Sequence, residues 1–191
     1  MWDNYEDLTY RANHSIGDDM SMPKLSHTTR VHFQNLNGVS LHKGGTWEQC
    51  CEQWHEMEVD IALACEHKVD TNHNSNMSAF YQQATTTLGQ STFALVAAST
   101  PTTGRRFDSK SGGTMAMVIG PSKGRIGSMH QDPVGRWVSI TFNQTRLAPI
   151  TMISTYKVVD VGWGFHVHQP TCWFLTSSTN LTNCGNIILT S

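Results

Sequence analysis

Apolar residues recur in an extended pattern in the run RVHFQNLNGVS (30–40). They lie on one side of a predicted strand: Val31, Phe33, Leu36 and Val39. Asn35 and Asn37 stand where this strand ends, although asparagine is a poor strand residue. Two interpretations stay open: a turn whose side chains bond the local backbone, or a pair of carboxamides directed into a site.

Two later stretches carry apolar residues at helical spacing. The first helix is predicted over 46–57 on the following positions: Trp47, Cys50, Cys51, Trp54 and Met57. Thr46, followed three residues later by Gln49, predicts a capping box at its start, directly after the breaker Gly45. A second helix is predicted over 74–89, with apolar residues four apart at Phe80, Ala84 and Leu88 and a terminal glycine.

Short apolar runs between Gly, Pro and Asn breakers predict strands. VDIALACEH (59–67) has the length of a buried strand, and a helix continuing to Cys65 is the competing interpretation. Further strands are predicted in five runs: STFALVAAS, GTMAMVIG, RIGSMH, RWVSITF and PITMISTY. Two helices early in the chain and strands late predict a layered α/β or α+β domain.

Composition divides the chain into three parts. Residues 1–29 lack periodicity and are interpreted as a loose polar leader, and 30–160 as the folded domain. The tail, 161–191, contains no Asp, Glu, Lys or Arg. It is either a buried edge of the fold or, the preferred interpretation, sequence not shaped to complete this fold, as a frameshift would give.

Overall charge says little about partners. The 191 residues carry a formal net charge of -2, and 15% of them are charged, so attraction to nucleic acid or to an anionic membrane requires a local patch. No apolar run approaches the roughly 20 residues of a membrane helix, and the start MWDNYEDLTY is acidic and polar. An intracellular protein, nuclear or cytoplasmic, is expected. Five cysteines without a CxxC pair are typical of reduced thiols.

Five segments together resemble the endonuclease/exonuclease/phosphatase superfamily, in order and in approximate spacing across residues 31–160. They are QNLNG (34–38), DIALACEH (60–67), SGGTMAMVIG (111–120), GRWVSITF (135–142) and ITMISTYKV (150–158). The similarity is closest to the nuclease domains of non-LTR retrotransposons and to apurinic/apyrimidinic endonucleases. The resemblance implies two packed, mostly antiparallel β-sheets flanked by helices, over a site that cleaves DNA phosphodiesters with Mg²⁺ or Mn²⁺.

The resemblance also implies roles for individual residues. Asn35 and Tyr156 match catalytic positions that order and contact the phosphate, and Glu66 matches the metal-binding glutamate. Asn37 falls at a second metal-binding position, where a carboxamide brings no negative charge and would bind Mg²⁺ weakly or through water. Taken alone, Glu66 would be read as an ordinary helix-end or salt-bridged residue and Tyr156 as a strand-end tyrosine.

A polar loop before SGG carries three basic residues that could contact a DNA backbone: Arg105, Arg106 and Lys110. Such residues are more often part of a solvated loop. The superfamily's second half, with GDFN-like and SDH-like segments, does not follow Tyr156 in this sequence. The sequence therefore predicts a truncated retroelement-type nuclease, incomplete at the C-terminus, whose catalysis is impaired or absent.

Two other functions remain open. One is a remnant that binds nucleic acid or protein without turnover. The other is structural Zn²⁺ binding by His166, His168 and Cys172, with His55 or His67 as a fourth ligand.

Overall fold

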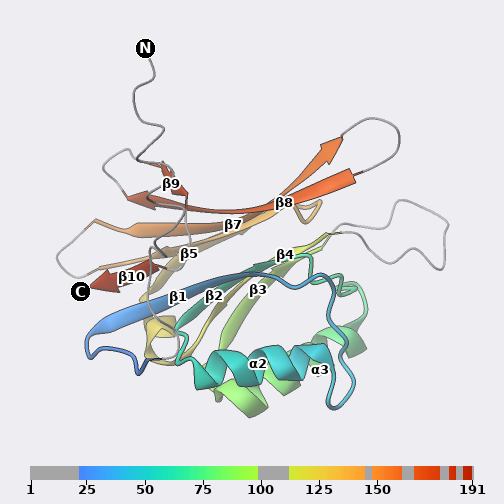
Figure 1. Cartoon of the computed structure of the whole chain (residues 1–191), viewed down its shortest axis with the longest axis horizontal. Coiled ribbons are helices and arrows are strands. Elements are labelled where there is room, and N and C mark those ends of the chain that lie inside the picture. The colour runs from blue at the N-terminus through green and yellow to red at the C-terminus, as the bar shows by residue number, and fades with distance from the viewer. Residues whose placement is uncertain are drawn as a thin grey trace.

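The computed structural model describes residues 22–98, 112–144, 148–160, 166–176, 181–183 and 187–190. Two five-stranded sheets face each other in it (Figure 1). In spatial order, the first sheet contains β10 (Ile187–Thr190), β1 (Thr28–Asn35), β2 (Ile61–Cys65), β4 (Thr114–Val118) and β3 (Phe93–Ala97). The second contains β5 (Ile126–Gln131), β6 (Trp137–Phe142), β7 (Ile150–Asp160), β8 (His166–Thr176) and β9 (Leu181–Asn183).

Strand pairing is antiparallel throughout both sheets, except that β1 and β2 run parallel. Two helices, α2 (Thr46–Glu56) and α3 (Asn74–Leu88), cover the face of the first sheet that points away from the second (Figure 1). A short 3₁₀ helix, η1 (Gly120–Arg125), connects β4 to β5. The α+β prediction of two packed, mostly antiparallel sheets flanked by helices is confirmed.

The apolar run 61–65 is a strand, and the alternative of a helix to Cys65 is wrong. All five residues of β2 are buried, because this strand lies between the helices and the second sheet. Ala62 and Ala64 belong to the core beneath the helices, whereas Ile61 and Leu63 pack toward the second sheet. A strand buried on both faces reads as a continuous apolar run, which explains why periodicity alone left two interpretations.

The helix predicted over 46–57 forms, but its predicted capping box does not. Gly45 is the N-cap residue of α2 and makes no side-chain cap hydrogen bond. The hydroxyl of Thr46 instead accepts a hydrogen bond from the Ser40 backbone N–H at 2.8 Å. Thr46 therefore ties the preceding loop to the first turn of the helix. The second predicted helix is confirmed as α3, followed by Gly89 with φ 93°.

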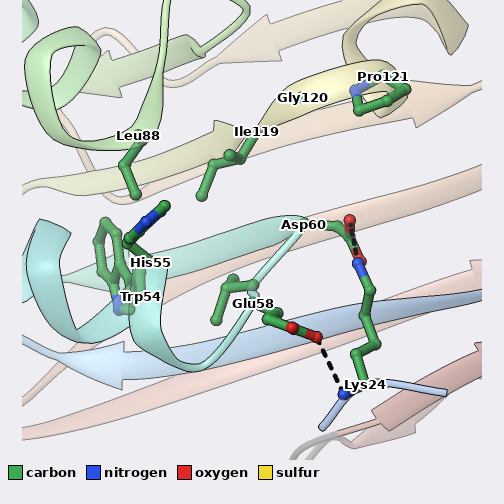
Figure 2. A pocket seen from close by; sticks show the side chains of 10 residues that line it. Lys24, Trp54, His55, Glu58, Asp60, Leu88, Ile119, Gly120 and Pro121 are labelled. Carbon is green, nitrogen blue, oxygen red and sulfur yellow. Dashed lines mark hydrogen bonds and ion pairs between the residues drawn. The ribbon is translucent and has the colours of Figure 1, made fainter.

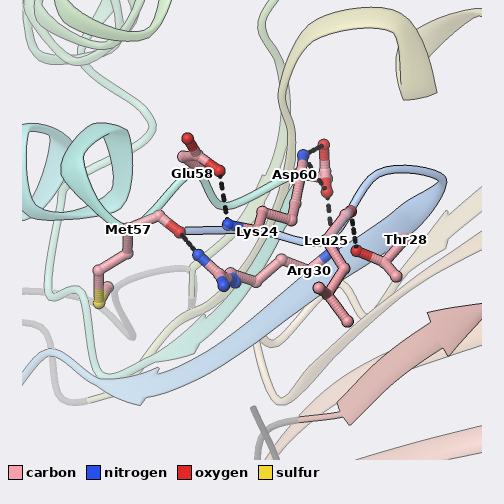
Figure 3. Close-up of polar contacts among 7 residues, drawn as sticks. All are labelled: Lys24, Leu25, Thr28, Arg30, Met57, Glu58 and Asp60. Carbon is pink, nitrogen blue, oxygen red and sulfur yellow. Dashed lines mark hydrogen bonds and ion pairs between the residues drawn. The ribbon is translucent and has the colours of Figure 1, made fainter. Parts of the chain in front are cut away.

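Residues at the start of the described chain are fastened to the first sheet by charged groups (Figure 3). Arg30 is only 2% exposed, and its guanidinium donates hydrogen bonds to the carbonyls of Met57 and Met22. The Asp60 carboxylate accepts hydrogen bonds from the Arg30 backbone N–H at 2.7 Å and from Lys24 Nζ at 2.8 Å. Of the predicted leader, 1–29, the part from residue 22 onward is described, and β1 begins two residues before the predicted domain start.

Backbone segments of the predicted tail, 161–191, extend both sheets. β8 pairs with β7, with Cys172 beside Ser154, and β9 pairs with β8. β10 pairs with β1, with Ile187 beside Val31. The proposal that this segment was not shaped for the fold stays a prediction.

The described thiols are unpaired. Cys50, Cys51 and Cys65 are free cysteines. Burial, followed by nearby negative charge, raises the pKa of both Cys51 and Cys65 to about 12. These two thiols are therefore protonated at neutral pH.

Candidate functional site

The expected site residues come from both sheets. Asn35 and Glu66 lie at strand ends of the first sheet, whereas Tyr156 lies inside β7 of the second sheet and is not a strand-end residue. Asn35 is the last residue of β1 and pairs with Cys65, the last residue of β2. Glu66 follows directly, and its backbone N–H donates to the Gly113 carbonyl at 2.7 Å. Ser154 of β7 donates its hydroxyl to the Ala64 carbonyl at 3.0 Å and so joins the second sheet to this end of β2.

Left-handed backbone conformations gather at this junction. Twelve described residues have positive φ, and six of them are here: Asn37, Gly38, Glu66, Lys68, Gly112 and Gly113. Hydrogen bonds bring the six together, since Gly38 donates its N–H to the Glu66 carbonyl and Lys68 donates its N–H to the Gly112 carbonyl. Non-glycine residues at positive φ are costly, and such strain concentrates at functional sites. The junction is therefore the best candidate site in the described chain.

Glu66 is the negative group at the junction. Its residue is 6% exposed. Within the described residues, no hydrogen bond or ion pair to its carboxylate is seen. Although the residue is mostly buried, its carboxylate oxygens are not among the buried polar atoms without a partner, so they remain accessible to solvent or to a cation. The site suits a divalent cation that prefers oxygen ligands and retains several waters.

Tyr156 extends from β7 toward the same junction. It is 6% exposed, and a Cβ added at Gly112 would lie 2.8 Å from Cε1 of its ring, so the ring lies against the backbone before β4. Burial, followed by the neighbouring acidic groups of Glu66 and then Cys65, raises the pKa of the Tyr156 hydroxyl to about 12. The phenol therefore keeps its proton at neutral pH and can donate a hydrogen bond.

Asn35 and Asn37 form a local turn. The Asn35 carboxamide oxygen accepts a hydrogen bond from the Asn37 backbone N–H at 2.9 Å, and Asn37 has φ 47°. The interpretation of a turn bonded to its own backbone is confirmed. The Asn37 carboxamide oxygen accepts from Lys68 Nζ at 3.1 Å, so this oxygen would have to release Lys68 before it could bind a metal ion.

His67 is a structural histidine, and the suggestion that it completes a Zn²⁺ site does not fit. The residue is fully buried. Nε2 lies 3.0 Å from the Ala97 carbonyl, and Nδ1 accepts from the Val69 N–H at 3.0 Å. Both ring nitrogens are thus used in holding the loop after Glu66.

This arrangement predicts a stability loss in acid. Burial lowers the pKa of His67 to about 4, so the folded state disfavours a proton that the unfolded chain accepts at its ordinary pKa of 6.5. The free energy of unfolding is therefore highest above pH 6.5. It decreases by about 3 kcal/mol in total as pH falls toward 4, because the unfolded chain takes up the proton first. Urea unfolding at pH 7, 5.5 and 4.5 measures this slope.

His67→Asn should flatten that slope, whereas His55→Asn on the surface should leave it unchanged. An equal acid sensitivity of wild type and His67→Asn would contradict the assignment.

Other expected residues are either outside the described part of the chain or distant from the junction. Arg105, Arg106 and Lys110 are outside the described residues, as are the side chains of His166, His168 and Cys172. His55 lines a pocket of about 390 Å³ with Trp54, Leu88 and Lys24 (Figure 2). That pocket adjoins Asp60, before β2, whereas Glu66 follows β2, so roughly 20 Å of strand separates it from the candidate site.

Three residues of the junction were missed by sequence reasoning about the site: Lys68, Gly112 and Gly113. The signals were present, because Lys68 stands two residues after Glu66 and the glycines directly precede β4. Without the strand register, neither signal indicates which residues meet.

Within the described residues, no cluster of three or more His, Cys, Asp or Glu side chains is placed to hold one metal ion.

None of the described helices combines the length and apolar character needed to cross a membrane.

Comparison of the sequence with protein-family models and with curated proteins gave no match.

Proposed function

We propose that this junction is a Mg²⁺-dependent phosphodiester site of the endonuclease type, acting on DNA with impaired hydrolysis. The supporting observation is Glu66, a 6% exposed residue whose carboxylate has no hydrogen bond or ion pair within the described residues. After burial, its negative charge is the next cause that raises the pKa of Tyr156, where the two sheets meet. A carboxylate beside a protonated phenol combines a cation ligand with a hydrogen-bond donor, and a phosphodiester needs both.

Each residue has a distinct role in this proposal. Glu66 would hold the cation, which would supply positive charge to offset negative charge on a phosphate oxygen. The Tyr156 hydroxyl donates a hydrogen bond to a phosphate oxygen, because its pKa of about 12 keeps it protonated. The Asn35 oxygen accepts the Asn37 N–H, so the NH₂ group of Asn35 is the part of this side chain that would donate to a phosphate.

Weak turnover follows from the groups present. His67 cannot act as a general base, because Val69 and Ala97 engage both of its ring nitrogens. Tyr156 is a poor base because its hydroxyl keeps its proton at neutral pH, which is also why it can donate a hydrogen bond. Loss of general-base assistance costs a factor of roughly 10²–10⁴ in rate.

The principal test is cation binding. Glu66→Gln removes the charge with little change in shape and is expected to weaken Mn²⁺ binding about tenfold or more, since the only charged ligand is lost. Mn²⁺ added to ¹⁵N-labelled protein should broaden the amide signals of residues 66–68 and 112–113. Glu58→Gln, at the far end of β2, is the matched control and should bind Mn²⁺ as wild type does.

Unchanged Mn²⁺ broadening in Glu66→Gln would rule out the proposed metal site. Nicking of supercoiled plasmid in Mg²⁺ and in EDTA tests turnover separately. Nicking at background level by folded protein is expected. Strong Mg²⁺-dependent nicking that disappears in Glu66→Gln would keep the site and overturn the impaired catalysis.

DNA binding without turnover is the second candidate, and Lys68 favours it. The ammonium group of its exposed side chain donates a hydrogen bond to the Asn37 carboxamide oxygen, beside the place proposed for the phosphate. Anisotropy of a labelled duplex separates the two functions: binding that persists in EDTA and falls in Lys68→Met supports a site that needs no metal. A requirement for Mg²⁺ supports the nuclease-type site.

A further inference from the structure

Among the described strands, β5 is an edge of the second sheet. It pairs with β6 on one side, and all residues from Gly127 to Gln131 are exposed. Its sequence, IGSMHQ, contains no Lys, Arg, Asp or Glu. Exposed strand edges commonly carry charges or proline that prevent pairing with another chain, and β5 has neither.

The corresponding edge of the first sheet is better protected. On β3, the Tyr81 hydroxyl of α3 donates to the Ala94 carbonyl at 2.8 Å. In the part of the chain that the structure describes, no hydrogen bond from outside β6 reaches the backbone of residues 127–131. A bulge disturbs β5 only between Ile126 and Ser128, and Ser128–Gln131 keep a regular register. Four consecutive residues can therefore accept a further strand.

Apolar surface accompanies this edge. Met129 is 42% exposed, although its partner Ile140 on β6 is fully buried in the core between the sheets. Paired residues point to the same face of a sheet, so Met129 marks the point where that core reaches the edge. An apolar side chain on an added strand would cover it.

Charge at one end of β5 indicates the kind of strand that fits. Lys123 and Arg125, in η1 directly before β5, are exposed, and neither forms an ion pair with a described residue. At the other end, Arg136 is paired with Asp132, Nε to Oδ2, at 3.0 Å. The uncompensated positive charge therefore lies at the Ile126 end.

We propose that β5 is a docking edge for an extended acidic segment of a protein partner. The segment adds antiparallel along Ser128–Gln131 and places an apolar side chain on Met129. Antiparallel addition brings the C-terminal end of the segment to the start of β5, where its carboxylates meet Lys123 and Arg125. Main-chain hydrogen bonds supply the affinity, and the two cations select the sequence and its direction.

The experiment uses the whole chain and two labelled peptides. The acidic peptide has five alternating Thr and Val residues followed by two Glu, and the matched basic peptide ends in two Lys. The acidic peptide is expected to bind at least tenfold more tightly by fluorescence anisotropy at low salt. It should also slow amide hydrogen exchange of residues 128–131 at least fivefold.

Charge reversal gives the sharpest control. The double variant Lys123→Glu and Arg125→Glu changes two exposed side chains and should retain the wild-type melting temperature. Its preference should invert, so that the basic peptide binds more tightly. Glu66→Gln should bind the acidic peptide as wild type does, which separates this proposal from the phosphodiester site.

Equal binding of the two peptides, or binding without slower exchange in β5, overturns the proposal. Protection of residues 128–131 that depends on protein concentration without peptide would assign the edge to a second copy of the chain and also overturn it. Displacement of the acidic peptide by a DNA duplex, with the same amides protected, would overturn it in favour of a nucleic-acid surface.

Discussion

Replacement of Trp47 by alanine is expected to lower the free energy of unfolding by about 3–5 kcal/mol. Trp47 is fully buried between α2 and α3, and its ring stacks on Phe80 with centroids 4.0 Å apart. The Trp54 ring packs edge-on against the Trp47 ring, with centroids 5.6 Å apart. The substitution leaves a large cavity and removes the hydrogen bond from the Trp47 indole N–H to the Phe80 carbonyl, 3.0 Å long. A domain stable by about 5–15 kcal/mol would lose a large fraction of that stability.

Urea unfolding followed by far-UV circular dichroism measures this loss. Trp137→Ala is the matched control, because Trp137 lies on β6 with 37% of its surface exposed. We expect the control to lose about 1 kcal/mol or less. Similar losses for the two variants would contradict the packing described between the helices.

The second large effect is expected from Gly113→Ala, about 4 kcal/mol of stability. Gly113 has φ 90°, which an alanine adopts only with strain of roughly 1–3 kcal/mol. Its added Cβ would overlap Nε2 of His67, a ring held at both nitrogens. Overpacking of this kind adds roughly 1–3 kcal/mol.

Gly89→Ala isolates the backbone part of that cost. Gly89 has a nearly identical φ of 93°, and a Cβ there would meet nothing within 4 Å. The two variants are compared by urea unfolding, and Gly113→Ala should lose roughly 1–3 kcal/mol more than Gly89→Ala. Equal losses of unfolding free energy in the two variants would show that His67 and its loop shift at no cost to make room for the added Cβ.

A consequence for the candidate site follows from the same contact. The Gly113 carbonyl accepts the Glu66 backbone N–H at 2.7 Å, so displacement of Gly113 shifts the carboxylate. The metal affinity proposed for Glu66 should therefore fall in Gly113→Ala along with stability. In Gly89→Ala it should not.

Local sequence patterns determined most elements of this fold. Helical spacing gave α2 and α3, because one apolar stripe of each helix had to face the core. Apolar runs bounded by glycine, proline and asparagine gave the strands from β2 to β7, and element order gave the α+β class. These signals depend on near neighbours in the chain, so the sequence carries them directly.

The capping box failed for a reason that local pattern could not supply. Ser40 competes for the Thr46 hydroxyl across six residues of loop. The path of that loop depends on where β1 ends beside β2, and tertiary contacts set that register. The identity of the turn residues at Asn35 and Asn37 was readable from the sequence, whereas the bond from Lys68 to Asn37 was not.

By itself, the sequence determined the elements, their order, and the candidate residues Asn35, Asn37, Glu66 and Tyr156. Only the tertiary structure decided that Tyr156 of the second sheet has Glu66 as a neighbour and that His67 is structural. It also placed Gly112 against the Tyr156 ring and Gly113 against His67. The physical reason is that residues 90 positions apart meet only through sheet pairing and packing, as the bond from Ser154 to Ala64 shows.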